Sequence, residues 1–351
     1  MRIAIDAMGG DNAPTATVKG AAQALALLPP EAAITLVGDD TAIRAELNDA
    51  KATHLLGPRL SILHASQVIG NDEPPAQAVR NKRDSSIYRG MELVKNGEAD
   101  AILSAGSTGA LIAAAFFVLR RLAGVRRPAL GAVLPTLIDG QPLLVLDVGA
   151  NTDCTEAELE QFAIMGRSYS KAILRQENPS VGLLSIGSED VKGNEVTKKT
   201  FELLKALGER GALKFRGNVE GFDLFKGETD VLVCDGFAGN VLLKTVEGTA
   251  KAIGKWMKRE FTAGPVRLLG ALCLSGAVRS MKRRMNPDIY AGAPLLGVNG
   301  TVIKTHGSST DDTVRHAIMT TFRAVQNNLT QTIADELALL TQNSAPPPPT
   351  A

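Results

Sequence analysis

Apolar runs of this chain end five times in a loop rich in glycine, serine, asparagine and aspartate. These segments are 3–11, 102–109, 144–153, 183–190 and 231–240. Glycines in such loops let backbone N–H groups approach an anion, and neighbouring carboxylates or amides can orient a phosphate or a carbonyl oxygen. The pattern therefore predicts a phosphate-binding face.

The side chains that could bind substrate at this face are carboxylates, amides, hydroxyls and one imidazole. With the loop glycines, the predicted phosphate or substrate ligands are Asp6, Gly9, Gly10, Asp11, Gly106, Ser107, Thr108, Gly109, Asn151, Asp153, Gly236, Gly239 and His306. Aspartate is also a common helix N-cap, and glycine after a strand is often only a turn residue. A structural role is therefore the alternative at several of these positions.

Three further residues are predicted to act on the reaction itself. Lys192 could balance the charge of a bound anion, and Asn240 could stabilise an oxyanion. Asp235 could orient or deprotonate a nucleophile, but several carboxylates beside a dianion would repel it, so the general base is left unassigned. A solvated lysine is the alternative for Lys192.

Several mechanisms lack their motifs. Neither G-x-x-x-x-G-K-[ST] nor G-x-G-x-x-G occurs in these loops, so a standard nucleotide fingerprint is missing. The histidines lack metal-ligand spacing, and no metal site is predicted. No G-x-S-x-G elbow is present, and no cysteine has a histidine nearby in sequence. Direct attack by bound phosphate on a carbonyl is therefore favoured over a covalent acyl-enzyme.

The apolar runs are continuous, which is typical of parallel strands covered on both faces. Strands and helices alternate from Arg2 to about Lys244, which predicts a doubly wound, mostly parallel sheet with ligands beyond the carboxyl ends of its strands. Between the motifs we expect helices over 15–28 and 41–48, strands over 34–37 and 60–64, and a helix after the loop 71–75 that has Arg80, Lys82 and Arg83 near its start.

Composition is typical of a cytoplasmic α/β enzyme. The 351 residues are 44% hydrophobic, and Lys plus Arg number 38 against 37 Asp plus Glu, so net charge gives no reason to expect a nucleic-acid partner. Three scattered cysteines indicate a reducing compartment, and no signal peptide is visible at the N-terminus. We expect one catalytic domain over 1–342, with one lobe or two, and a disordered proline-rich tail over 343–351.

The segment 251–284 is basic and amphipathic. Nine Lys or Arg residues face the single acidic residue Glu260, and leucines cluster over 265–278. The apolar stretch is too short to span a bilayer, but it could lie in the membrane interface or dock an acidic carrier protein. The predicted contact residues are Arg267, Leu268, Leu272, Arg279, Lys282 and Arg283. A helix packed across a dimer interface is an equal alternative, and both could hold.

Five motifs, in order, resemble those of the bacterial phosphate acyltransferases of phospholipid synthesis. They are 6–14, 104–111, 146–153, 161–166 and 234–241. The similarity continues through two more motifs, 286–293 and 301–307, and covers residues 1 to about 330. Ser107 and Ala238 stand where asparagine and threonine are common in that family, and neither change removes a charge.

The resemblance implies an acyl-acyl-carrier-protein:phosphate acyltransferase without metal or organic cofactor. It implies a three-layer α/β/α fold with an active-site cleft, of the isopropylmalate dehydrogenase and phosphotransacetylase type. It also implies a homodimer at the inner face of the cell membrane, whose product is used by a membrane glycerol-3-phosphate acyltransferase. The alternatives are a phosphotransacetylase-like enzyme that uses acyl-coenzyme A, a nicotinamide-dependent dehydrogenase, and a non-catalytic carrier-protein or membrane adaptor.

Overall fold

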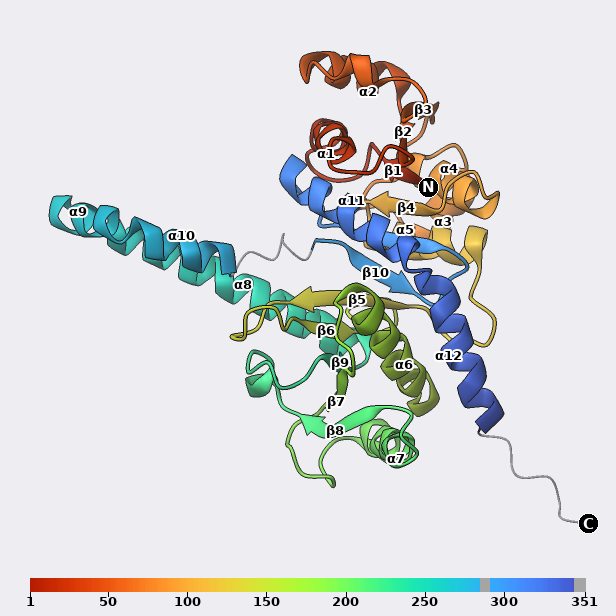
Figure 1. The fold of residues 1–351 in the computed structure, drawn as a ribbon, viewed down its shortest axis with the longest axis vertical. Coiled ribbons are helices and arrows are strands. Elements are labelled where there is room, and N and C mark those ends of the chain that lie inside the picture. The colour runs from red at the N-terminus through yellow and green to blue at the C-terminus, as the bar shows by residue number, and fades with distance from the viewer. Residues whose placement is uncertain (285–290, 344–351) are drawn as a thin grey trace, which may run out of the picture.

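The computed structural model describes residues 1–284 and 291–343, which form layers around an eleven-stranded sheet (Figure 1). The strands are β1 Arg2–Asp6, β2 Ala33–Gly38, β3 Leu60–His64, β4 Ala101–Ser104, β5 Ala129–Leu134, β6 Leu143–Leu146, β7 Ser180–Leu184, β8 Lys214–Val219, β9 Val231–Val233, β10 Ala293–Leu296 and β11 Thr301–Lys304. The predicted tail, 343–351, lies outside the described residues except for Asn343.

Helices connect most of these strands. They are α1 Thr15–Leu25, α2 Asp40–Asp49, α3 Pro75–Asn81, α4 Ser86–Lys95, α5 Thr108–Ala114, α6 Glu156–Ile173, α7 Glu195–Glu209, α8 Gly236–Phe261, α9 Pro265–Cys273, α10 Ser275–Arg284, α11 Asp311–Gln326 and α12 Leu329–Asn343. Short helical turns lie at η1 Thr53–Leu55 and η3 Gly221–Asp223, and η2 Ala115–Leu119 continues α5 as a π-helix.

The sheet consists of two parallel halves that run in opposite directions. Its strand order is β3-β2-β1-β4-β11-β10-β5-β6-β9-β7-β8. The strands from β3 to β11 are parallel, as are those from β6 to β8, but β11–β10, β10–β5 and β5–β6 are all antiparallel. Three reversals make the second half antiparallel to the first. The C-terminal ends of the strands in the two halves therefore lie on opposite sides of the sheet. We call these two sides, each defined by strand ends and not by an outermost strand, the two edges.

Helices cover both faces of this sheet. Helices α3, α4, α5 and α8 pack over one face, where a single apolar core extends across both halves. On the other face, α1, α2 and α11 cover the first half, and α6, α7 and α12 cover the second. The three-layer α/β/α class predicted from the sequence is confirmed.

Two helix predictions were wrong at their ends. The helix predicted over 15–28 stops at Leu25, because Pro29 has no N–H to donate to the Leu25 carbonyl; the Arg59 guanidinium donates to the Leu25, Leu28 and Pro29 carbonyls instead. The helix after the loop 71–75 is short, so its basic residues lie at its end rather than its start. Arg80 is in the last turn of α3, and the two basic residues that follow lie beyond it.

The later part of α8, with α9 and α10, forms an arm that projects from the layers (Figure 1). Its apolar side chains include the exposed residues Trp256, Val266, Leu268, Leu269, Leu272, Leu274 and Met281. The predicted contacts Arg267, Leu268, Leu272 and Arg279 lie on this arm, whereas the side chains of Lys282 and Arg283 lie outside the described part. Within the ranges described, no helix has both the length and the apolar character needed to cross a bilayer.

Candidate active site

Three polar side chains stand side by side where three parallel strands end. Asp6 ends β1, Ser104 ends β4 and Lys304 ends β11. The strand register pairs Asp6 with Ser104 and Ser104 with Lys304, so the three side chains project to the same face. Residues two positions earlier in each strand belong to the core under α4 and α5, so the row faces that layer. All three residues are buried.

Asp6 organises the two glycine loops beside it. The Ser104 hydroxyl donates to Asp6 Oδ2 at 2.6 Å and accepts from the Gly106 N–H at 3.0 Å, while the Met8 N–H donates to Asp6 Oδ1 at 3.2 Å. A Cβ at Gly9 would lie 2.4 Å from Asp6 Oδ2 and 2.6 Å from the Gly106 nitrogen. Burial raises the pKa of Asp6 above its ordinary value. Gly9 and Gly106 are therefore fixed parts of this scaffold.

Gly10 brings the loop after β1 against the loop after β11. Its φ is 102°, in the region that favours glycine, and a Cβ there would lie 2.9 Å from the Gly307 carbonyl oxygen. The Asp11 N–H donates to the same oxygen at 2.7 Å. The N–H groups of Gly10 and Gly307 have no acceptor within the described ranges. These two amides are available to an anion.

Lys304 is a buried cation in the middle of these loops, with a relative exposure of 7%. Its ammonium donates to the Thr305 carbonyl oxygen, and none of the described carboxylates forms an ion pair with it. Burial lowers the pKa of Lys304 to about 8, and Asp6 and Asp11 partly oppose this effect. The sequence reasoning missed Lys304. A charged residue ending an apolar strand, as here after 301–303, is the signal that could have found it.

In the loop after β4, the contacts of the predicted ligands Ser107, Thr108 and Gly109 are mainly structural. Ser107 caps α5 by accepting from the Ala110 N–H at 3.4 Å, and Thr108 is the first residue of that helix. A Cβ at Gly109 would lie 2.6 Å from Pro75 Cγ, so this glycine lets α3 pack closely against α5.

His306 links the first edge of the sheet to α8. Its Nδ1 is 2.8 Å from Ser308 Oγ, and its Nε2 is 4.0 Å from the Glu247 carboxylate on α8. Burial lowers the pKa of His306. The charge of Lys244, one turn earlier on α8, also acts on both His306 and Lys304.

A second cluster follows β6 at the opposite edge. The Asp147 carboxylate accepts N–H groups from Leu130 at 3.0 Å, Gly149 at 3.1 Å and Asn151 at 2.7 Å. The Asn151 side-chain amide donates to Asp147 Oδ2 at 2.9 Å and to the Pro128 carbonyl at 2.7 Å. Both amide hydrogens of this buried side chain are in use, so Asn151 holds the loop in shape.

Gly236 and Gly239 allow α8 to start directly against this cluster. The Gly236 N–H donates to the Asn151 carbonyl at 2.7 Å. A Cβ at Gly239 would lie 1.9 Å from the Asp147 carbonyl oxygen, a distance that no side chain can accept. These two glycines are required for backbone packing.

Asp235 and Asn240 lie in the first turns of α8. Asp235 is its N-cap and accepts from the Ala238 N–H at 2.7 Å, so the structural alternative applies to at least one of its oxygens. Asn240 is exposed, and its side chain lies 3.8–3.9 Å from where a Cβ on Gly149 would be. Of the two predicted catalytic residues that follow β9, Asn240 is exposed and Asp235 is half-buried.

Lys192 and Asp153 are more peripheral. Lys192 follows β7 at the same edge, its side chain is 46% exposed, and its amine is 4.0 Å from the Glu189 carboxylate of its own loop. Asp153 is exposed and accepts from the Thr152 hydroxyl at 3.3 Å. The described contacts bring neither residue onto the cluster around Asp147.

The five loops therefore do not share one edge, which corrects the expectation of a single phosphate-binding face. Of these five, the loops after β1 and β4 lie at one edge, together with the loop after β11, and those after β6, β7 and β9 lie at the other. Helix α8 joins them: it begins at Gly236 and reaches His306 at Glu247, roughly 17 Å along its axis. Asn240 lies one turn before Lys244 on this helix.

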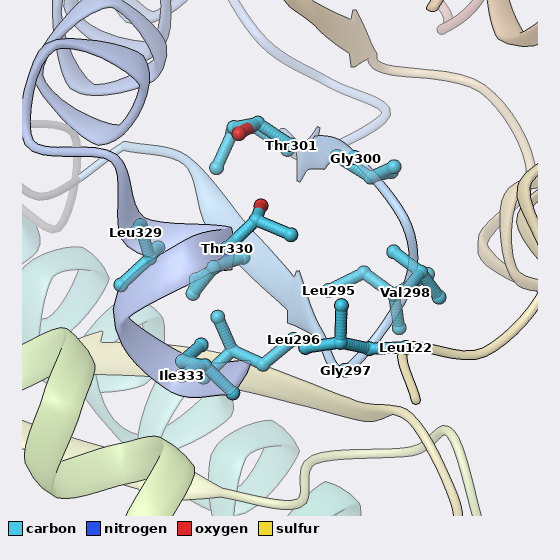
Figure 2. A pocket seen from close by; sticks show the side chains of 13 residues that line it. Leu122, Leu295, Leu296, Gly297, Val298, Gly300, Thr301, Leu329, Thr330 and Ile333 are labelled. Atoms are coloured by element: carbon cyan, nitrogen blue, oxygen red, sulfur yellow. The ribbon is translucent and has the colours of Figure 1, made fainter. Parts of the chain in front are cut away.

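Figure 2 shows a pocket away from these loops, between β10, β11 and the start of α12. Its lining is mostly aliphatic, with Leu295, Leu296, Leu329 and Ile333 among the side chains. None of the predicted site residues lines it, so it gives no support to a role in the chemistry. No group of three or more His, Cys, Asp or Glu side chains in the described ranges is placed to hold a metal ion.

Comparison with known proteins decides the family. A family model described as "Fatty acid synthesis protein" matches residues 1–332. A phosphate acyltransferase of Janthinobacterium sp. (strain Marseille) is 45% identical over 348 residues, which cover 99% of this chain and 96% of that protein. One of Geobacillus thermodenitrificans is 47% identical over 337 residues, covering 96% and 99%. The chain belongs to the phosphate acyltransferase family. It is an acyltransferase of lipid synthesis, so the adaptor alternative is excluded.

Solved structures agree on the fold. The EutD phosphotransacetylase from Staphylococcus aureus matches with a TM-score of 0.57 and 16% identity, over 93% of this chain and 94% of that one. A phosphotransacetylase from Streptococcus pyogenes matches with a TM-score of 0.56 and 19% identity over the same shares. At this identity the likeness concerns the fold alone, and it confirms the predicted phosphotransacetylase-like architecture.

Proposed function

We propose that this phosphate acyltransferase transfers the acyl group of a long-chain acyl-[acyl-carrier-protein] thioester to inorganic phosphate. The products are acyl phosphate and the free thiol of the carrier protein. The observation that carries the proposal is the identity of 45–47% to proteins named phosphate acyltransferase over almost the whole chain. The glycine loops around Asp6 and Lys304 support it, because they combine free amides with a buried cation.

The reaction is a single displacement. A phosphate oxygen attacks the thioester carbonyl carbon, the carbon–oxygen bond forms, and the carbon–sulfur bond then breaks with its electron pair on sulfur. A thiol has a pKa near 8.5, so the leaving thiolate requires little general-acid help and is protonated by solvent or by the phosphate proton. No covalent acyl-enzyme is needed.

Asn240 is proposed to donate to the carbonyl oxygen as negative charge develops on it. Its amide is exposed in the second turn of α8, the helix that connects the two edges. Losing one such donor lowers turnover by about 10²–10³. The roles of Lys192 as a source of positive charge and of Asp235 as an orienting group for phosphate stay predictions from the sequence, since Lys192 lies beside Glu189 and Asp235 caps α8.

The arm is proposed to contact the membrane, the carrier protein or a second copy of the chain. Leu268 and Leu272 are 47% and 63% exposed on α9, and the basic residue Arg267 lies beside them. Exposed apolar area of this kind is typical of interaction surfaces. The proposal also includes a membrane acyltransferase that uses the acyl phosphate product.

The test is incubation of the purified chain with long-chain acyl-[acyl-carrier-protein] and ¹⁸O-labelled phosphate, with mass detection of acyl phosphate. We expect labelled acyl phosphate and free carrier thiol in equal amounts. The same assay with acyl-coenzyme A distinguishes the alternative donor. Faster turnover of the coenzyme A thioester at equal concentration would replace the carrier-protein proposal.

A further inference from the structure

Lys304 is an unusual residue for the end of a buried strand. It is 7% exposed, its ammonium reaches a neutral carbonyl of Thr305, and no ion pair to a carboxylate is formed within the described part of the chain. An ammonium taken out of water without a counter-ion is costly, and such groups are normally paired. The Lys304 ammonium therefore has no described anion within ion-pair distance.

The surroundings of Lys304 fit a phosphate better than a protein carboxylate. The Gly10 and Gly307 amides, which have no acceptor among the described residues, belong to the two loops that meet beside it. Asp6 is held by Ser104 and Met8, so its oxygens are turned to the scaffold. Backbone amides and one buried cation together make an anion site.

We propose that Lys304 binds the acceptor phosphate, at the edge formed by β1, β4 and β11. The inference rests on the proposed acyl transfer and adds a residue to it. Phosphate bound there lies on the side of α8 that carries Lys244, one turn beyond Asn240. The thioester carbonyl then enters between the phosphate and the Asn240 amide, and the attack of the phosphate oxygen proceeds as described above.

Lys192 is the competing residue. It lies at the opposite edge, its side chain is 46% exposed, and Glu189 is its nearest charge. The two lysines lie at opposite edges of the sheet, and no described contact joins them. Burial and the missing counter-ion favour Lys304.

The experiment compares four full-length variants. Lys304→Met removes the charge and keeps most of the side-chain volume, and Lys304→Arg keeps a cation. Lys192→Met tests the competing edge, and Lys95→Met, at the exposed end of α4, controls for charge removal alone. Inorganic phosphate is titrated in two assays, thermal unfolding and acyl phosphate formation, with sodium chloride at matched ionic strength.

We expect Lys304→Met to raise the KM for phosphate about tenfold to a hundredfold and to leave the KM for the acyl thioester unchanged. Phosphate should raise the unfolding temperature of the wild type and of Lys95→Met, but not that of Lys304→Met. Lys304→Arg should recover part of the loss. An unchanged phosphate KM in Lys304→Met, or a loss confined to Lys192→Met, overturns the assignment.

The pH dependence of the wild type gives a second readout that needs no variant. Phosphate affinity should fall above about pH 8 as Lys304 loses its proton. The other charged groups facing it are Asp6 on β1, Asp11 in the following loop, Lys244 on α8 and His306. His306 is already neutral in this range because burial lowers its pKa. A flat affinity between about pH 7.5 and 9.5 contradicts the proposal.

The two proposals can fail separately. A wild type that binds phosphate through Lys304 but forms no acyl phosphate refutes the proposed reaction and leaves the phosphate site in place. A wild type that forms acyl phosphate while Lys304→Met keeps its phosphate KM refutes only the site.

Discussion

The stability of this chain should rise with pH because of Lys304, and Lys304→Met should abolish that rise. Burial lowers the pKa of the folded-state amine to about 8, against an ordinary value of 10.5. Below about pH 8 the lysine is protonated in both the folded and the unfolded chain, and the cost of burying the charged amine lowers the stability of the folded chain. Between about pH 8 and 10.5 the folded chain has released the proton while the unfolded chain still binds it, so stability increases.

The size of the effect follows from the two pKa values. A separation from 10.5 to about 8 corresponds to about 3 kcal/mol of lost unfolding free energy at neutral pH. Linkage then predicts that about 2 kcal/mol is regained between about pH 7 and pH 9.5. Methionine has no proton to bind, so the variant lacks this contribution.

The assay is urea unfolding of the wild type and Lys304→Met at both pH values, without phosphate. Other lysines, tyrosines and cysteines titrate in the same range, but they contribute equally to both proteins. The difference between the two pH dependences therefore isolates Lys304, whatever methionine does to the packing. Lys95→Met, on the exposed end of α4, should behave as the wild type. Identical pH dependence in wild type and Lys304→Met would show that the amine is hydrated in the folded chain.

Three further predictions concern other parts of the site and the arm. Gly9→Ala should lower the unfolding free energy by at least about 2 kcal/mol in urea titrations, because its Cβ would meet the Gly106 backbone at 2.6 Å; wild-type stability contradicts the described loop contact. Asn240→Ala should reduce kcat about 10²–10³-fold with little change in unfolding, and a normal kcat makes Asn240 a bystander. Replacing both Leu268 and Leu272 with Glu should release the chain from anionic vesicles in flotation while acyl transfer persists, since both side chains are exposed; continued flotation places membrane contact elsewhere, and a shift to monomers in light scattering indicates a dimer interface.

Sequence reasoning located most of the strands and loops of this fold, but not β5, β8 or β10, and not the strand directions. Short apolar runs with glycine-rich ends predicted β1, β4, β6, β7 and β9 and the turns that follow them. The reversals at β10 and β5 are carried by runs that are equally apolar and equally short, so periodicity cannot distinguish them from parallel strands. Without the strand directions, the sequence predicted one phosphate-binding face, whereas the loops lie at two edges.

The same limit explains which site residues were found. Residue type identified Asp6, Asn151 and Asp235 as polar groups at strand ends, but type does not tell a ligand from a scaffold. The structure shows the Asn151 amide bound to Asp147 and Pro128, and Asp235 bound to the first turn of α8. These bonds depend on tertiary neighbours that the sequence does not reveal.

Lys304 and Lys192 show how a charge acquires a role from its surroundings. Both are lysines at the end of a strand or in the loop that follows, and the apolar run directly before Lys304 is the one local difference that could rank it above Lys192. The register with Ser104 and Asp6 buries Lys304 without a carboxylate partner, whereas Lys192 remains half exposed beside Glu189. The charge of an exposed lysine is hydrated by water and screened by salt, but a buried lysine without a counter-ion gains most from binding an anion. This is why we place the phosphate at the edge of β1, β4 and β11, where folding has already removed water from the Lys304 ammonium.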